Sequence, residues 1–180
     1  MPIAIKTELL VSDTNRNLLP YAAEFIQRFM SRHKVVVVSG SGSAADELLY
    51  SCCESVIRGV HRFTLRQLAC EIARPSLAGR GVITAERLPL EAIIRHLIHE
   101  GETSKQLTYF GQVSSTPHFS AAAYRTLNEL RWEGIKPEQL TGKDRAGSDL
   151  AILLSAYEKA LSERGLADGA AGAAQATLAS

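Results

Sequence analysis

Cysteine is scarce in this chain, with three in 180 residues. Cys52 and Cys53 are adjacent and cannot readily bridge each other, and Cys70 stands apart from both. No C-x-x-C motif and no cysteine/histidine spacing of a zinc site is present in the sequence. The sequence therefore predicts buried thiols, no metal, and the reducing environment of the cytoplasm.

Long apolar runs are also missing. No stretch approaches the ~20 residues of a membrane-spanning helix, and no basic region followed by an apolar one opens the chain. We therefore expect a soluble cytoplasmic protein without a membrane partner. The net charge of +1 indicates no partner, but seven arginines against three acids lie between Arg58 and Arg95. Such a stretch suits a polyanion, although a set of solvated helix faces would look the same.

Apolar periodicity predicts an α/β fold. The four consecutive valines Val35–Val38 lack apolar/polar alternation, which is typical of a parallel strand covered on both faces. A break is expected at Pro75, and the segment from Leu166 onward shows no capping motif and is expected to be a frayed end. The expected strands are residues 8–12, 34–38 and 59–64, and the expected helices are 18–32, 43–56, 65–73, 85–100, 117–134 and 148–164.

A loop of small residues, SGSGS, follows the valines. Gly40, Gly42 and Ala45 satisfy the G-x-G-x-x-A pattern of a dinucleotide-binding loop, but the next strand, GVHRFT, offers no acid for the ribose. A phosphate-binding P-loop would need a lysine after its last glycine, and none follows here. Asp46 and Glu47 at the start of the next helix would also repel a triphosphate. We expect no ATP at this loop, and a nucleotide-binding enzyme that uses it remains an alternative.

Three serines make this loop a candidate site for a single phosphate. Ser39, Ser41 and Ser43 lie at the carboxyl end of a buried strand, where a helix begins. Hydroxyls and free amides in such a place bind one phosphate of a nucleic-acid backbone. The alternative is structural: the serines cap the helix, and the glycines make the turn.

Three further segments of the sequence are distinctive: GVHRFTLRQLA, LTYFGQVSSTPHFSAAAYRTLNELRWEGIKPEQL and DLAILLSAYEKALSERGLAD. Together with the serine loop they resemble the N-terminal helicase-like region of AddB-type subunits of helicase–nuclease complexes, which are exonuclease V-like proteins of the PD-(D/E)xK nuclease family. More distantly, the chain resembles the first motor domain of UvrD-like helicases. The resemblance covers about residues 8–168 and implies a P-loop-NTPase-like parallel sheet with a mostly helical insertion. It also implies an incomplete core at 1–72 and 148–180 and a helical subdomain at 73–147.

The resemblance also implies the site residues. VVSGSGSAADEL matches the DNA-contacting turn of these helicases, and FTLRQLACEIA matches a second contact, with Arg66 in place of a histidine. The expected DNA-binding residues are Ser39, Ser41, Ser43, Thr64, Arg66 and Arg62. Because the carboxyl ends of neighbouring parallel strands lie side by side, we expect the serine loop close to Thr64–Arg66. An ion pair between Arg66 and Glu71 is the alternative.

The position of the family's ATP-binding loop is occupied by SDTNRN, without its glycines and lysine. The residues of this degenerate nucleotide loop are Ser12, Asp13, Thr14, Asn15, Arg16 and Asn17, and Asp13, Asn15 and Asn17 are expected to serve as helix caps and turn formers. The expected function is therefore that of a fragment of a DNA double-strand-break repair helicase–nuclease subunit. It would contact the DNA backbone and a partner subunit, with no catalytic residue and no cofactor of its own. The parent protein would be an ATP-dependent helicase/exonuclease, and a scaffold that docks a partner subunit is a further alternative.

Overall fold

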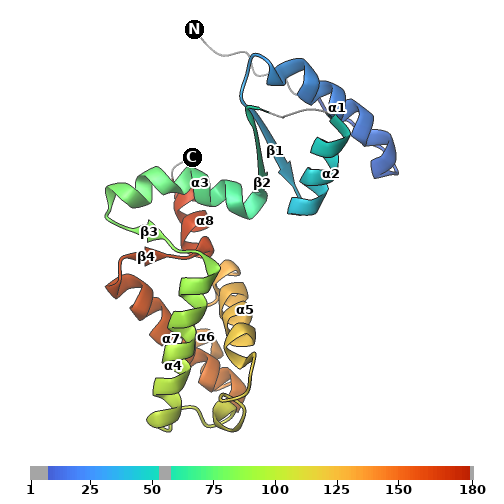
Figure 1. Ribbon diagram of the computed structural model, residues 1–180. Helices are drawn as coiled ribbons and strands as arrows, with labels where there is room; N and C mark the ends of the chain where they lie inside the picture. Colours follow the sequence, from blue (N-terminus) through green and yellow to red (C-terminus); the bar gives the residue numbers. More distant parts are fainter. Residues whose placement is uncertain (1–7, 53–57, 179–180) are drawn as a thin grey trace. The chain divides into compact units, whose positions relative to one another are not determined.

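The computed structural model describes residues 8–52 and 58–178. It is a mixed α/β protein, mostly helical, with short parallel strands (Figure 1). The chain folds into two compact units, Met1–Leu68 and Ala69–Ser180. None of the helices in the described ranges combines the length and the apolarity that crossing a bilayer requires.

The first unit is a two-stranded parallel sheet with two helices on one face. Its core contains Ile26, Val35 and Cys52, all buried, and Val37 and Val60 pack against them. Strands β1 and β2 pair from Val35 opposite Val60 onward. The elements are α1 (Asn15–Met30), β1 (Val35–Ser39), α2 (Gly42–Cys52) and β2 (Val60–Thr64), after which α3 (Leu65–Gly79) begins at once.

Two expectations for this unit are wrong. Val36 and Val38 remain 51% and 46% exposed, so the valine strand is covered on only one face, because α1 and α2 both pack on the side of Val35. The apolar run at residues 8–12 is not a strand, and Leu9 and Val11 are exposed. In the described structure β1 and β2 pair only with each other, and a run without a pairing partner gains no ladder of hydrogen bonds. Cys52 is buried as expected, whereas residues 53–56 of the predicted helix lie outside the described residues.

The second unit is a helical bundle with a small two-stranded sheet. Its main core contains Ile94 of α4, Leu127 of α5, and Leu154 and Tyr157 of α7, each at most 1% exposed. A separate apolar cluster joins α3 to the C-terminal residues. The remaining elements are β3 (Ile83–Thr84), α4 (Arg87–Thr103), the 3-10 turn η1 (Phe110–Gln112), α5 (Phe119–Trp132), α6 (Pro137–Leu140), α7 (Arg145–Glu163), β4 (Leu166–Ala167) and α8 (Gly169–Leu178).

The four long helices expected after residue 64 are confirmed, with shifted ends. The break expected at Pro75 is wrong, because α3 continues to Gly79 and buries Ala73 and Leu77 on one side. The frayed end expected from Leu166 is also wrong, because this segment forms β4 and α8. Helix α7 packs on α4 and α5. The expected division of the chain into an α/β core (1–72 and 148–180) and a helical subdomain (73–147) stays a prediction.

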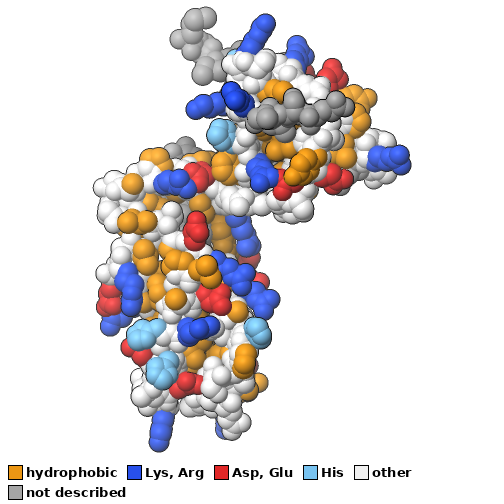
Figure 2. All heavy atoms as spheres, in the orientation of Figure 1, with side chains coloured by type: hydrophobic (Ala, Val, Ile, Leu, Met, Phe, Trp, Pro, Cys, Tyr) orange, Lys and Arg blue, Asp and Glu red, His pale blue; other side chains and the backbone are white. Residues whose placement is uncertain are grey.

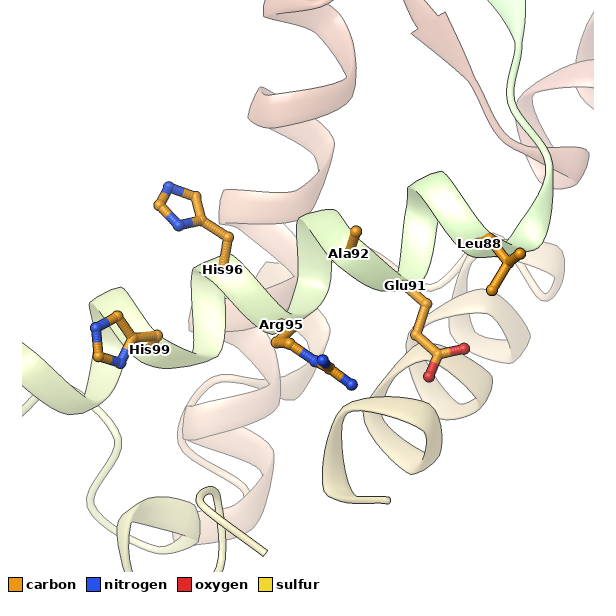
Figure 3. A pocket seen from close by; sticks show the side chains of 6 residues that line it. All are labelled: Leu88, Glu91, Ala92, Arg95, His96 and His99. Carbon is orange, nitrogen blue, oxygen red and sulfur yellow. The ribbon is translucent and has the colours of Figure 1, made fainter. Parts of the chain in front are cut away.

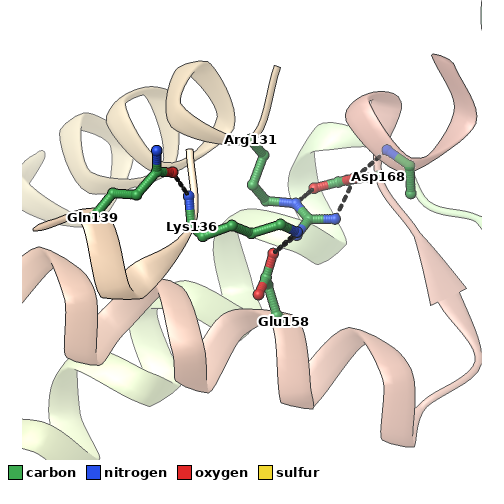
Figure 4. A network of polar contacts seen from close by, with 6 residues as sticks. Arg131, Lys136, Gln139, Glu158 and Asp168 are labelled. Atoms are coloured by element: carbon green, nitrogen blue, oxygen red, sulfur yellow. Dashed lines mark hydrogen bonds and ion pairs between the residues drawn. The ribbon is translucent and has the colours of Figure 1, made fainter. Parts of the chain in front are cut away.

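A buried ion pair ties α5 to the C-terminal segment (Figure 4). Asp168 is 1% exposed, and its carboxylate accepts hydrogen bonds from Arg131 Nε at 2.5 Å and Nη2 at 3.2 Å. Asp168 Oδ1 also accepts the amide of Ala171 at 2.9 Å, so this side chain caps α8 as well. Arg131 Nη1 donates to Glu158 at 2.5 Å. Burial alone would lower the pKa of Arg131, but the hydrogen bond and charge of Asp168 raise it, so the guanidinium stays charged.

A second buried carboxylate shapes the segment after α4. Asp149 of α7 is 1% exposed and accepts hydrogen bonds from three consecutive amides, those of Thr108 at 3.0 Å, Tyr109 at 2.8 Å and Phe110 at 2.9 Å. The Thr108 hydroxyl donates to the same side chain. Asp149 therefore fixes the turn that leads into η1.

Candidate nucleic-acid interface

The serine loop (Ser39–Ser43) and the start of α3 lie at the same edge of the β1–β2 sheet. Because the two strands are parallel and in register, Ser39 is the pairing partner of Thr64 (Figure 1). Both strands end there, and each is followed directly by a helix or by the loop that leads into one. The structure thus brings together two segments that are more than twenty residues apart in the sequence.

The hydroxyls of the serine loop bond mainly within the loop. Ser39 Oγ donates to the carbonyl of Ser41 at 2.6 Å, and Ser41 Oγ accepts the amide of Ala44 at 3.2 Å. The Ser41 and Ser43 hydroxyls are 3.1 Å apart. Ser41 therefore caps α2, as the structural alternative requires. The amides of Gly42 and Ser43, in the first turn of the helix, have no acceptor in the described part of the chain.

The two glycines of the loop are not explained by the turn. Neither Gly40 nor Gly42 has a positive φ, and a Cβ atom at either position would meet nothing within 4 Å. An alanine would fit both places in the protein as it stands. Neither glycine is therefore required by the backbone conformation or by packing within the described structure.

Thr64 forms a reciprocal cap with Gln67 at the start of α3. The Thr64 amide donates to Gln67 Oε1 at 2.8 Å, and the Gln67 amide donates to Thr64 Oγ1 at 3.3 Å. This is a capping box, and the T-x-x-Q pattern of the sequence is its signature. In this arrangement the Thr64 hydroxyl accepts, and its own hydrogen is left for another acceptor.

The two arginines differ in their surroundings. Arg62 forms an ion pair with Asp46 of α2, because residue 62 faces the side of the sheet on which α2 packs. Its charge is therefore partly neutralised. Arg66 is exposed in the first turn of α3, two residues after Thr64. Glu71, the expected alternative partner of Arg66, forms an ion pair with Arg74, and a pair between Arg66 and Glu71 stays a prediction.

Asp13, Thr14, Arg16 and Asn17 of the degenerate nucleotide loop are exposed, and the loop leads into α1. The Ser12 hydroxyl donates to Asp13 and accepts the amide of Thr14. Asn15, Arg16 and Asn17 form the first turn of α1. The cap residue of α1 is Thr14, without a side-chain hydrogen bond, so the expectation that Asp13 caps the helix is wrong. Because α1 and β1 run in opposite directions, this turn lies toward the carboxyl end of β1 (Figure 1).

Comparison of the chain with models of protein families gives no match, and comparison with curated proteins gives none either. Within the described ranges, no group of three or more histidine, cysteine, aspartate or glutamate side chains could hold a metal ion. Within the described ranges the strand ends present hydroxyls, backbone amides and two exposed arginines, of which Arg62 is paired with Asp46.

Proposed function

We propose that the first unit binds the sugar–phosphate backbone of DNA at the edge formed by the serine loop and Thr64–Arg66. It would do so as a P-loop-NTPase-like helicase domain that does not hydrolyse ATP, in a cytoplasmic helicase–nuclease subunit that repairs double-strand breaks with a partner subunit. The observation that carries this proposal is the register of the sheet, which pairs Ser39 with Thr64.

The donors at this edge match the needs of a backbone phosphate. The amides of Gly42 and Ser43 and the hydroxyl hydrogen of Thr64 are hydrogen-bond donors, and Arg66 adds a positive charge. Hydroxyls, amides and arginines make most phosphate contacts in protein–DNA complexes, and they position DNA without reading its sequence. The open surface over Gly40 and Gly42 supports a close approach.

The lack of ATP hydrolysis is inferred from the degenerate nucleotide loop. A triphosphate needs a glycine-rich loop with a lysine, and SDTNRN contains neither glycine nor lysine. We expect no binding of Mg-ATP tighter than about 1 mM, or about −4 kcal/mol. Calorimetry that gave a micromolar constant would instead favour a nucleotide-binding enzyme.

The test is a titration of the whole chain with fluorescently labelled single-stranded DNA, read by anisotropy at two salt concentrations. The expected dissociation constant is roughly 10⁻⁴–10⁻⁶ M, and it should weaken as salt increases. Arg66→Ala should lower the affinity about equally for all sequences and reduce the salt slope by about one unit. Arg58→Ala is the matched control, because Arg58 is exposed before the amino end of β2, away from Thr64. Equal affinity of Arg66→Ala and the parent, or an equal loss in both variants, would contradict the proposal.

A further inference from the structure

A hollow of ≈ 480 Å³ lies in the second unit between α4, the segment Ser114–His118 and the start of α5. Hydrogen bonds from the segment 114–118 to α4 and to the residues just before this segment fix the walls of the hollow. The Ser114 hydroxyl donates to the Glu102 carboxylate and lies 3.1 Å from the carbonyl oxygen of Gly111, and the Thr116 hydroxyl donates to the carbonyl of Val113 at 2.6 Å. We call this space the α4–α5 hollow.

Arg95 is the unpaired cation of this hollow. The neighbouring charges on α4 have partners: Arg87 lies 3.4 Å from Glu91, and His96 lies 3.3 Å from Glu100. Arg95 is exposed and has no acidic partner in the part of the chain that the structure describes. Its side chain leaves α4 on the same side as that of Glu91, whose carboxylate pairs with Arg87 (Figure 3).

Further donors line the same space. His99 reaches it from α4 and His118 from the residue before α5, and both imidazoles are exposed. The hydroxyls of Ser115 and Ser120 also line it and have no hydrogen-bond partner within the described ranges. Histidine and basic side chains are visible with acidic ones on this unit in Figure 2.

The one carboxylate of the hollow is already engaged. Glu102 accepts the Ser114 hydroxyl, and its other oxygen is 3.9 Å from His99 Nδ1. An arginine, two imidazoles and two hydroxyl-bearing residues line the space, and Glu102 is the acidic residue among the side chains that line it. A guanidinium with several hydrogen-bond donors around it suits a phosphate, whose oxygens accept several bonds at once. The space of ≈ 520 Å³ along α4 in Figure 3 shares Arg95 and His99, but its lining side chains all come from this one helix.

We propose that the α4–α5 hollow binds a phosphate group, carried either by a small phosphate compound or by a nucleic-acid backbone. The guanidinium of Arg95 holds two phosphate oxygens, and His99, His118, Ser115 and Ser120 donate to the others. This site is separate from the serine loop and does not depend on the function proposed for the first unit.

The test is nuclear magnetic resonance of the whole ¹⁵N-labelled chain, titrated with inorganic phosphate at constant ionic strength, with chloride as the reference salt. Saturable shifts are expected at the amides of 114–120 and at Arg95 Nε, with a dissociation constant on the order of millimolar, as for a single small anion. A second titration uses a dinucleoside monophosphate, which carries one internal phosphodiester. The ligand with the lower dissociation constant, this compound or inorganic phosphate, identifies the source of phosphate that the site prefers.

Arg95→Gln should weaken phosphate binding at least about tenfold, because the positive charge and the two-oxygen contact of the guanidinium are both lost. Arg125→Gln is the matched control, since Arg125 is an exposed arginine of α5 that does not line the hollow, and it should leave the constant unchanged. The proposal is overturned if no saturable shift occurs at 114–120, or if both variants lose affinity equally. Shifts confined to the serine loop would also overturn it, because they would place phosphate in the first unit alone.

Discussion

The ion pair between Arg131 and Asp168 gives the sharpest test of how the second unit is held together. Asp168→Ala removes a carboxylate that is 1% exposed and leaves the guanidinium of Arg131 with Glu158 as its remaining carboxylate at hydrogen-bond distance. It also removes the acceptor for the amide of Ala171 at the start of α8. Both losses act on the same unit, so the variant should unfold more easily.

The magnitude follows from these two losses. Removing one partner of a buried ion pair typically costs about 3–5 kcal/mol, and losing a helix cap costs about 0.5–2 kcal/mol. The Arg131 side chain is 14% exposed and keeps its ion pair with Glu158. The cost of removing the ion-pair partner should therefore be near the lower end of its range, about 3 kcal/mol. We therefore expect the free energy of unfolding to fall by about 3–5 kcal/mol, out of the 5–15 kcal/mol or so that stabilise a typical domain.

Urea unfolding followed by circular dichroism measures this change, and the midpoint should fall by about 2 M for a slope near 2 kcal/mol per molar. Glu163→Ala is the control, because it breaks the exposed Lys159–Glu163 pair and should change stability by less than about 0.5 kcal/mol. The double variant Arg131→Met with Asp168→Leu should lose less free energy of unfolding than the sum of the two single variants. Removing both partners leaves neither Arg131 nor Asp168 as a buried charge without its partner. A loss below about 1 kcal/mol in Asp168→Ala, or strict additivity, would refute the reasoning.

Two further variants concern α7. Asp149→Ala should lower the free energy of unfolding by about 2–4 kcal/mol, because three amides lose their acceptor, and hydrogen exchange at residues 108–110 should accelerate; unchanged exchange would contradict this. Tyr157→Phe should raise stability by about 1 kcal/mol in urea unfolding, because the buried Tyr157 hydroxyl has no hydrogen-bond partner among the described residues. Burial, and then the charge of Asp168, raise the pKa of Tyr157, so the unfolded state loses this proton first and stability falls above about pH 10. This alkaline loss should be smaller in Tyr157→Phe, and an equal loss would contradict the assignment.

The elements that the sequence predicts well are those with a long apolar stripe. Leu150, Leu154, Tyr157 and Leu161 repeat at helical spacing and pack into or against one core in the structure, so the existence of α7 could be predicted, although its ends could not. Residues 8–12 show the limit of such reasoning. An apolar run becomes a strand only when a neighbouring strand pairs with it, and no local pattern reports whether that neighbour exists.

The C-terminal elements were missed for a different reason. The sequence LADGAAGAAQA has no apolar stripe, and α8 begins where Asp168 caps it while also binding Arg131, 37 residues away. At the candidate interface, parallel strands were enough to expect the serine loop beside Thr64. The ion pair of Arg62 with Asp46 could not be predicted, because it depends on which face of the sheet α2 covers.

The pairing of β3 with β4 has a consequence for how the protein can be taken apart. Thr84 and Ala167 are paired across the β3–β4 sheet, where neighbouring strands lie about 4.8 Å apart. The two ends of the intervening segment, residues 85–165, are therefore close together in space. Most apolar side chains of this segment pack into the main core of the second unit, which is separate from the cluster that joins α3 to the C-terminal residues. A short linker could therefore span the gap that residues 85–165 would leave, but a replacement would also have to supply a cation for the buried Asp168, whose partner Arg131 lies within this segment.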